Sequence, residues 1–188
     1  MRRLLICVAL FLCVSFTLEA YNRNDAVAYA RKLAKGANHK CGSYSSCTRD
    51  SYWGSEVCEY ALQGGDCANF VSQCLVLGGK HPNLKGGNCR GYPCGFEEIG
   101  AKRLGDCSKD KGWKSACGLN AKPPAGLKAG DVLIYHAGSC DSYDAHAVIV
   151  TTAGATPKIS CHRSAKLDVA YTYMGSSKPY LQWIQYKG

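Results

Sequence analysis

The chain has 188 residues, thirteen cysteines and a formal net charge of +9 at pH 7. That length is sufficient for one domain with a buried core. The lysines and arginines are scattered and form no dense stripe, so nucleic acid is excluded as an expected partner. The net positive charge instead favours anionic surfaces such as bacterial walls, acidic glycans or anionic lipid.

The first segment, residues 1–20, is predicted to be a secretory signal peptide. Arg2 and Arg3 precede the apolar run LLICVALFLCVSF, and the small residue Ala20 follows near its end, which is the order of regions in a cleaved leader. A retained membrane anchor is the alternative, but the run is short for a span. No second apolar run approaches that length. We therefore expect residues 21–188 to form a single exported domain without a membrane span.

Eleven of the thirteen cysteines follow the predicted leader. In an oxidising compartment this density predicts a disulfide framework. Because eleven is odd, at least one sulfur has no partner within the chain, and we expect the other ten to pair. A leftover thiol in an exported protein is either an intermolecular link or a reactive group, and the count does not say which residue carries it.

Helices are predicted in the first part of the chain. Apolar residues recur at helical spacing over residues 22–36 and 67–77, and caps are available at Asn22 or Asn24 for the first helix and Asp66 for the second. The Gly78-Gly79 pair is expected to stop the second helix. The stretches between and after these helices are rich in Gly, Ser, Pro and Cys. We interpret them as cross-linked loops, with one short helix around the run FEEIGAKRL.

Strands are predicted in the last third of the chain. The runs DVLIYH, AHAVIVTTA, PKISCH and YLQWIQY are short, rich in β-branched or aromatic residues, and separated by turn-forming residues. Helices thus come first and strands second. This order predicts a disulfide-rich α+β domain in which N-terminal helices pack on a C-terminal antiparallel sheet.

The segment GGDCANFVSQCLVLGG places Cys67 in the first turn of the second predicted helix. On that helix Cys67 shares an apolar stripe with Phe70, Val71, Cys74 and Leu75. The positive end of a helix stabilises a thiolate at such a position, and the backbone N–H of Cys67 is placed to donate to an oxyanion. These are the needs of a cysteine nucleophile. A half-cystine is the competing interpretation, because most cysteines here are expected to pair.

A cysteine nucleophile needs a base, and the predicted strand ends offer His136, His146 and His162. An imidazole at a strand end can lean over a helix N-terminus. Spacing does not choose among the three, and a hydrogen-bonded edge residue remains the plain interpretation of each. A zinc site built from the three is a further alternative. No HExxH motif or paired CxxC spacing supports it, so we expect neither a metal nor a cofactor.

The order GGDCANFVSQCL, AGDVLIY, AHAVIV and ISCH resembles the putative amidase domain of secreted bacterial proteins, which is similar to the NlpC-like cell-wall cysteine peptidases. The resemblance covers roughly residues 22–165. It implies a papain-like fold with Cys67 as the nucleophile, His146 as the general base and His162 as the residue that orients the imidazole. Asp131 matches the Gly-Asp turn that opens the sheet, and we interpret it as a structural turn residue.

The sequence therefore leads us to expect a secreted papain-like cysteine hydrolase that cleaves an amide bond, with bacterial peptidoglycan peptide as the leading substrate class and the cell wall as its partner. The alternative from another class is a catalytically inactive, disulfide-rich binding or toxin-like protein on the same scaffold. A third possibility keeps the site but transfers the acyl group to an amine, since both reactions share the acyl-enzyme. Oligomeric state is not indicated by the sequence.

Overall fold

The computed structural model describes residues 20–34, 67–80, 88–89, 92–93, 100–110, 112–162 and 166–186. The predicted signal peptide up to residue 19, the Asp66 cap and the loop predicted before it lie outside the described residues. Within the described part of the chain, no helix is long and apolar enough to cross a membrane.

The centre of the fold is a six-stranded antiparallel sheet in the order β3-β8-β4-β5-β6-β7. Its strands are β3 (Lys114–Leu119), β4 (Val132–His136), β5 (Ala145–Thr152), β6 (Lys158–Cys161), β7 (Lys166–Ala170) and β8 (Tyr180–Gln185). A separate two-stranded ribbon pairs β1 (Asn88–Cys89) with β2 (Tyr92–Pro93). Helices come before the large sheet along the chain, which confirms the predicted α+β class.

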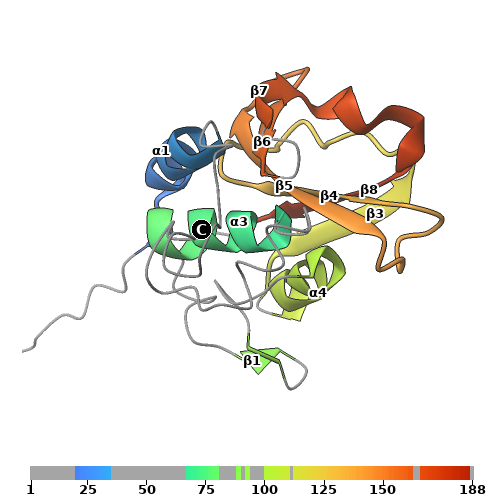
Figure 1. The fold of residues 1–188 in the computed structure, drawn as a ribbon, viewed down its shortest axis with the longest axis horizontal. Coiled ribbons are helices and arrows are strands. Elements are labelled where there is room, and N and C mark those ends of the chain that lie inside the picture. The colour runs from blue at the N-terminus through green and yellow to red at the C-terminus, as the bar shows by residue number, and fades with distance from the viewer. Residues whose placement is uncertain are drawn as a thin grey trace, which may run out of the picture.

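The helices cover one face of the sheet and a short 3-10 segment covers the other (Figure 1). The covering helices are α1 (Arg23–Ala34), α3 (Cys67–Gln73) with its continuation η2 (Cys74–Gly78), and α4 (Ala101–Asp110). The 3-10 segment is η3 (Tyr171–Ser177). Alternation of side chains along β4 and β5 supplies one apolar set to each face. The sheet therefore has a core on both sides and is a central layer.

Within the six-stranded sheet, two strands were missing from the sequence prediction, and both lie at its edges. β3 and β7 each pair on one side only, and neither buries a residue fully. An edge strand needs fewer apolar side chains than a central one, so the alternating pattern that reveals a strand is weak there. By contrast, β4 buries every one of its residues, and its run DVLIYH was recognised.

Helix α1 begins as the sequence predicts. The Asn22 side-chain oxygen accepts the backbone N–H of Asp25 at 3.1 Å, which is an N-cap bond. The Asn22 backbone N–H donates to the carbonyl of Gly79 at 2.8 Å, so the cap also fastens α1 to the end of η2. The short helix predicted around FEEIGAKRL overlaps α4 at residues 101–104, and α4 continues to Asp110, while residues 96–99 of that run lie outside the described residues.

The helix that begins at Cys67 ends at the predicted glycine pair, but not by the expected left-handed cap. Its last turn is a π-turn in which the Gly79 N–H donates to the carbonyl of Cys74 at 2.8 Å, and Gly79 keeps a right-handed φ of −87°. The glycines are needed for close approach instead. A Cβ at Gly78 would lie 2.6 Å from the Cβ of Tyr29, and one at Gly79 would overlap the Tyr21 ring. The two glycines therefore let the backbone of η2 approach the side chains of Tyr21 and Tyr29 closely.

Part of the predicted disulfide framework is present. Cys117 of β3 is bonded to Cys140 in the β4–β5 hairpin, with a Cα–Cα distance of 6.0 Å, and Cys107 of α4 is also in a disulfide. Cys67, Cys74 and Cys161 carry reduced thiols. The expectation that ten of eleven cysteines pair is therefore wrong. The three thiols are all buried, where packing against apolar neighbours suits a reduced cysteine.

Asp131 joins three parts of the fold at the entrance to β4. Its carboxylate accepts the backbone N–H of Lys128 at 2.7 Å and of Tyr186 at 3.3 Å, and it pairs with the Arg23 guanidinium of α1 at 2.6 Å. The Asp131 side chain is only 1% exposed. A buried carboxylate with these donors connects α1, the turn before β4 and the end of β8. The structural interpretation of Asp131 agrees with these contacts.

Asp131→Ala should lower the free energy of unfolding by about 3 kcal/mol, because it leaves the partly buried Arg23 charge without its carboxylate. Urea unfolding followed by tryptophan fluorescence measures the change. Asp141→Ala, at an exposed hairpin position, is the matched control and should change stability by less than about 0.5 kcal/mol. Equal effects of the two substitutions would contradict the role given to Asp131.

Candidate functional site

Cys67 is the first residue of α3, and its side chain faces the sheet. The residue is 4% exposed, and the four other members of its stripe, Phe70, Val71, Cys74 and Leu75, are completely buried. Helix α3 packs against β5 and β6, and Cys67 belongs to the same apolar cluster as Ala147 and Ile149 of β5. The predicted apolar stripe is confirmed. It places the Cys67 thiol at the start of α3, which packs against β5, the strand that carries His146.

Cys67 carries a reduced thiol in this structure, and so does Cys74 on the same stripe. The bridge between these two residues that would characterise an inactive binding protein is not formed. Because a thiolate is the nucleophilic form of cysteine, a reduced sulfur at the start of the helix retains the capacity to react. The half-cystine interpretation of Cys67 has no support in the described part of the chain.

His146 is the second residue of β5 and is 1% exposed. Strand alternation puts it on the face of Val148 and Val150, which pack in the second apolar cluster, away from the helices. The ring of Tyr173, from η3, meets the His146 imidazole edge-on with 6.2 Å between ring centroids. The imidazole is thus held where η3 covers the beginning of β5.

His162 follows the last residue of β6 and is 9% exposed. Its imidazole stacks on the Phe70 ring, with centroids 5.3 Å apart and planes inclined by 22°. Phe70 lies three residues after Cys67, which is less than one turn of helix. His162 therefore lies against the first turn of α3, and the structure brings it next to the helix that carries the candidate nucleophile.

Tyr173 links the remaining parts of the site and was missed by the sequence analysis. Its hydroxyl lies 3.3 Å from the sulfur of Cys161, and its ring contacts His146. Burial raises the pKa of the Tyr173 hydroxyl above its ordinary value, and the nearby Cys161 and Cys67 raise it further. The phenol therefore stays protonated at neutral pH. Tyr173 thus contacts both the His146 ring and the Cys161 sulfur.

The only sequence signal for Tyr173 is the aromatic run YTYM after the second histidine strand. That run has no strand or helix periodicity, because η3 is a 3-10 segment interrupted at Gly175, where φ is +49°. An aromatic residue whose role depends on such an irregular segment has no pattern by which it can be recognised.

The imidazole of His136 is engaged in hydrogen bonds of its own and does not contact these residues in any described interaction. Its Nδ1 lies 3.1 Å from the carbonyl oxygen of Ser142, and its Nε2 lies 3.0 Å from Oε1 of Gln182. Both ring nitrogens are engaged, and the residue is fully buried. His136 is a structural histidine, and the ambiguity among the three strand-end histidines is reduced to His146 and His162.

The three histidines do not form a metal centre. Among the residues that the structure describes, no group of three or more His, Cys, Asp or Glu side chains is arranged to hold a metal ion. His136 uses both nitrogens in protein contacts, as just described, so it has none to offer a metal. The zinc alternative thus loses one of its three ligands.

The comparison with known families assigns this chain to a class. Residues 20–185 match the family described as putative amidase domain, and the chain belongs to that family. At a coarse level, membership indicates a hydrolase of amide bonds. No curated protein and no solved structure matches the chain, so the particular substrate and mechanism have to be argued from its own residues.

Tyr173→Ala should expose Cys161, because the tyrosine contacts that sulfur and covers the adjacent strand end. Since thiol modification follows exposure, we expect iodoacetamide to alkylate Cys161 about tenfold faster than in the wild type. Peptide mass mapping of the native protein over time gives the rate. Tyr143→Ala, which truncates a tyrosine that is 74% exposed, should leave the rate unchanged. Identical alkylation rates in the wild type and in Tyr173→Ala would show that Tyr173 does not shield the Cys161 thiol from the reagent.

Proposed function

We propose that the protein is an exported, papain-like cysteine amidase that hydrolyses peptide bonds of bacterial peptidoglycan. Cys67 is the nucleophile, His146 the general base and His162 the residue that orients the His146 imidazole. The observation that carries this proposal is the reduced Cys67 thiol in the first turn of α3, with His162 stacked on Phe70 of that helix and Tyr173 in contact with His146. Membership of an amidase family supplies the reaction class.

The proposed reaction proceeds through an acyl-enzyme. His146 takes the thiol proton, and the Cys67 sulfur attacks the carbonyl carbon of the scissile amide, whose oxygen becomes an oxyanion. The Cys67 backbone N–H, which as the first N–H of the helix has no intrahelical acceptor, donates to that oxyanion. His146 then returns the proton to the leaving amine. A water molecule, deprotonated by His146, releases the carboxylic acid and restores the thiol.

Positive charge supports the choice of a bacterial wall as the place of action. The chain has a formal net charge of +9, and cationic proteins concentrate on polyanionic surfaces such as walls. The family supports amide cleavage, and peptidoglycan stem peptides supply amide bonds at that surface. The two arguments concern different properties of the protein, namely where it adsorbs and what its site can cut.

Cys67→Ala should abolish clearing in a zymogram of bacterial walls, with a loss of roughly 10³-fold or more in the rate of amide cleavage, since it removes the covalent nucleophile. Amine release from soluble wall fragments measures the rate. Cys74→Ala is the matched control, because it removes a second reduced, buried thiol from the same stripe. Equal clearing by wild type and Cys67→Ala would defeat the proposed function.

The two histidines should be separable by their variants. His146→Ala should lower kcat by about 10²- to 10⁴-fold, the usual contribution of a general base. His162→Asn should retain more activity than His162→Ala, because an amide can still hydrogen-bond a neighbouring imidazole. Steady-state kinetics on soluble wall fragments distinguishes the four proteins. If His162→Ala is as inactive as Cys67→Ala while His146→Ala remains active, the roles of the two imidazoles are exchanged.

A further inference from the structure

A β-bulge interrupts the edge of the sheet close to His162. The pairing register of β6 with β7 shifts between Ile159 and Cys161, so that two residues of β7, at positions 167–168, face the single residue Ser160. Such a bulge bends its strand and re-aims side chains, and bulges are common next to active sites. His162 follows β6 directly, so the bulge lies only two residues from the candidate site.

Asp168 has the backbone conformation that this bulge requires. Its φ is +50°, in the left-handed region that few residues other than glycine, asparagine and aspartate adopt. Its backbone N–H donates to the side-chain oxygen of Ser160 at 3.2 Å. Ser160 is completely buried, so this bond fixes the bulge to the interior of β6. A β-branched residue at position 168 would be strained in the same conformation.

The Asp168 carboxylate reaches across β6 to the strand on its other side. It accepts the hydroxyl of Thr151 of β5, and Thr151 is itself the extra residue of a second register shift, between β5 and β6. The two bulges therefore flank β6 and are joined by a hydrogen bond between their side chains. Because Thr151 is buried, this bond is a stronger constraint than a contact at the surface.

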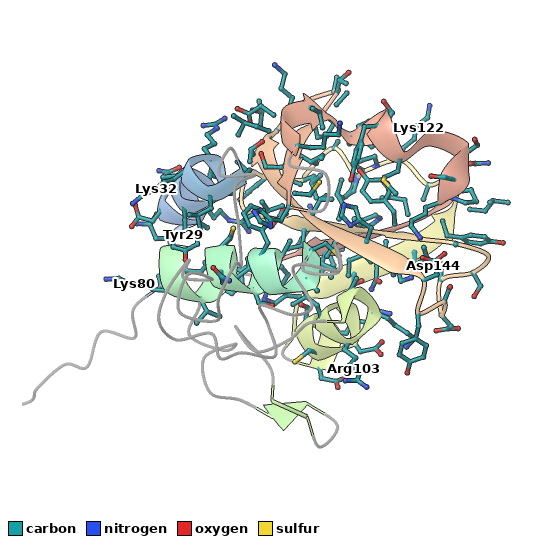
Figure 2. All side chains as sticks on the ribbon, in the orientation of Figure 1. Tyr29, Lys32, Lys80, Arg103, Lys122 and Asp144 are labelled. Atoms are coloured by element: carbon teal, nitrogen blue, oxygen red, sulfur yellow. A yellow bond between two sulfur atoms is a disulfide. The ribbon has the colours of Figure 1, made fainter. Side chains whose placement is uncertain are left out.

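Arg31 of α1 connects both bulges to the helix layer. Its Nε donates to the Asp168 carboxylate at 3.1 Å, and its Nη2 donates to the carbonyl of Thr151 at 3.2 Å. Lys32, the next residue, lies on the outer side of α1 (Figure 2). The Arg31 and Asp168 side chains are 46% and 32% exposed, and an ion pair this exposed contributes little by itself. The bonds to the buried Ser160 and Thr151 are therefore the main constraints on Asp168.

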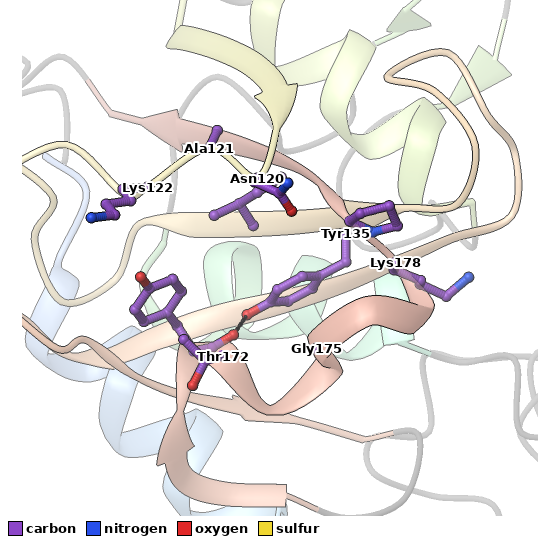
Figure 3. Close-up of a pocket in the computed structure, with 10 residues that line it drawn as sticks. Asn120, Ala121, Lys122, Tyr135, Thr172, Gly175 and Lys178 are labelled. Carbon is purple, nitrogen blue, oxygen red and sulfur yellow. Dashed lines mark hydrogen bonds between the residues drawn. The ribbon is translucent and has the colours of Figure 1, made fainter.

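The end of β7 beyond the bulge is held independently. Tyr171, the first residue of η3, donates its N–H to the carbonyl of Pro157 at 3.0 Å. Its carbonyl accepts the Tyr135 hydroxyl, in the wall of a pocket between η3 and the outer face of the sheet (Figure 3). Since this end is fixed, the extra residue in β7 has to be accommodated toward the other end of the strand, where Lys166 pairs with Cys161.

His162 lies on the same face of the sheet as the contacts of the bulge. The residues on either side of Ser160 belong to the apolar cluster on the outer face. Alternation therefore turns Ser160 and His162 to the helix face, where His162 stacks on Phe70. Residues two apart in a strand are separated by about 6.6 Å. The bond from Asp168 to Ser160 is thus one side-chain position away from the imidazole.

We propose that Asp168 is a positioning residue for His162. The bulge that Asp168 anchors sets the direction in which β6 ends, and so holds the His162 imidazole against Phe70 at the first turn of α3. The inference rests on the proposed function, in which His162 orients the catalytic imidazole. It adds to that site a residue that acts through the shape of the sheet edge and not through contact with the reacting atoms.

The direct test is the ring-proton NMR signal of His162 in the native protein. Stacking on Phe70 should displace this signal from its position in an unstacked imidazole, and its absence from His162→Gln identifies it. Asp168→Val puts a β-branched residue in the left-handed conformation and removes the acceptor for Thr151, so the displacement should be lost. Asp168→Asn tolerates that conformation and keeps an acceptor oxygen, so it should retain the displacement.

Ala170→Val is the matched control, since it introduces the same side chain into β7 at an exposed position with an ordinary φ of −58°. It should leave the His162 signal unchanged. The His136 signal reports folding, because that imidazole is buried and hydrogen-bonded in the central strands. If Asp168→Val does not fold, Asp168→Gly decides: glycine adopts a positive φ without strain, and the variant loses only the carboxylate contacts. It should also lose the displacement.

Cleavage of soluble wall fragments gives a second readout. Asp168→Val should lower kcat roughly tenfold or more with little change in KM, because a misdirected orienting residue impairs the chemical step and not substrate binding. Asp168→Asn should stay close to the wild type, and so should Ala170→Val. A general loss of stability would not distinguish these variants by the His162 signal and kcat together.

The outcomes separate this inference from the proposed function. An unchanged His162 signal in both Asp168→Val and Asp168→Gly would overturn the inference, and so would a fall in kcat with the signal in place. A displaced signal lost in these variants together with normal cleavage would support the positioning by Asp168 and remove His162 from the proposed reaction. If the wild type cleaves no wall fragment, the NMR comparison still decides the role of Asp168.

Discussion

The burial of one apolar stripe that runs along α3 and η2, with α3 packed against β5 and η2 against α1, is the contact on which the rest of this structure depends. Phe70, Val71, Cys74 and Leu75 are fully buried in it, and Cys67 occupies the same stripe one turn earlier. Burial of several large side chains at roughly 25 cal/mol per Å² fixes the rotation of the helix about its axis. That rotation directs the thiol of Cys67 toward the sheet, so the packing that stabilises the fold also positions the candidate nucleophile.

The surrounding structure keeps this contact in register. Asn22 caps α1 and bonds to Gly79 at the end of η2, while the glycine pair allows η2 to approach α1 closely. Asp131 ties α1 to the beginning of β4 through Arg23. These contacts lie at the far end of the helix from Cys67. They fix where α3–η2 ends, and the sheet fixes which face it buries, so the position of the first turn follows from both.

The sequence predicted those elements whose patterns report burial. Strands β4, β5, β6 and β8 and the stripe on α3 are dense in apolar residues and were found, and Asn22 was one of the two capping residues predicted for α1. β3, β7 and η3 were not, because edge strands and 3-10 segments leave little periodic signal. Only the first turn of α4 was predicted, because its buried face is made largely of small residues, Ala101, Gly105, Cys107 and Ser108, which give a weak apolar pattern.

The same reasoning explains what could be foreseen of the candidate site. Cys67 stands in a recognisable segment and His146 and His162 at recognisable strand ends, whereas the order of the strands and the hydrogen bonds of His136 had to come from the three-dimensional structure. Tyr173 and the pocket belong to tertiary contacts between η3 and the sheet, which no local pattern encodes. The number of reduced cysteines could not be predicted from the sequence either, because an odd number of cysteines requires only that at least one of them has no partner.

The most direct test of the central claim is covalent trapping of the native protein with a peptide that carries a thiol-directed electrophile in place of its scissile amide. Mapping of the adduct by mass spectrometry should find it on Cys67 and not on Cys74 or Cys161, and His146→Ala should slow its formation strongly. An adduct on another thiol, or a Cys67 that remains unmodified while the peptide is bound, would contradict the account.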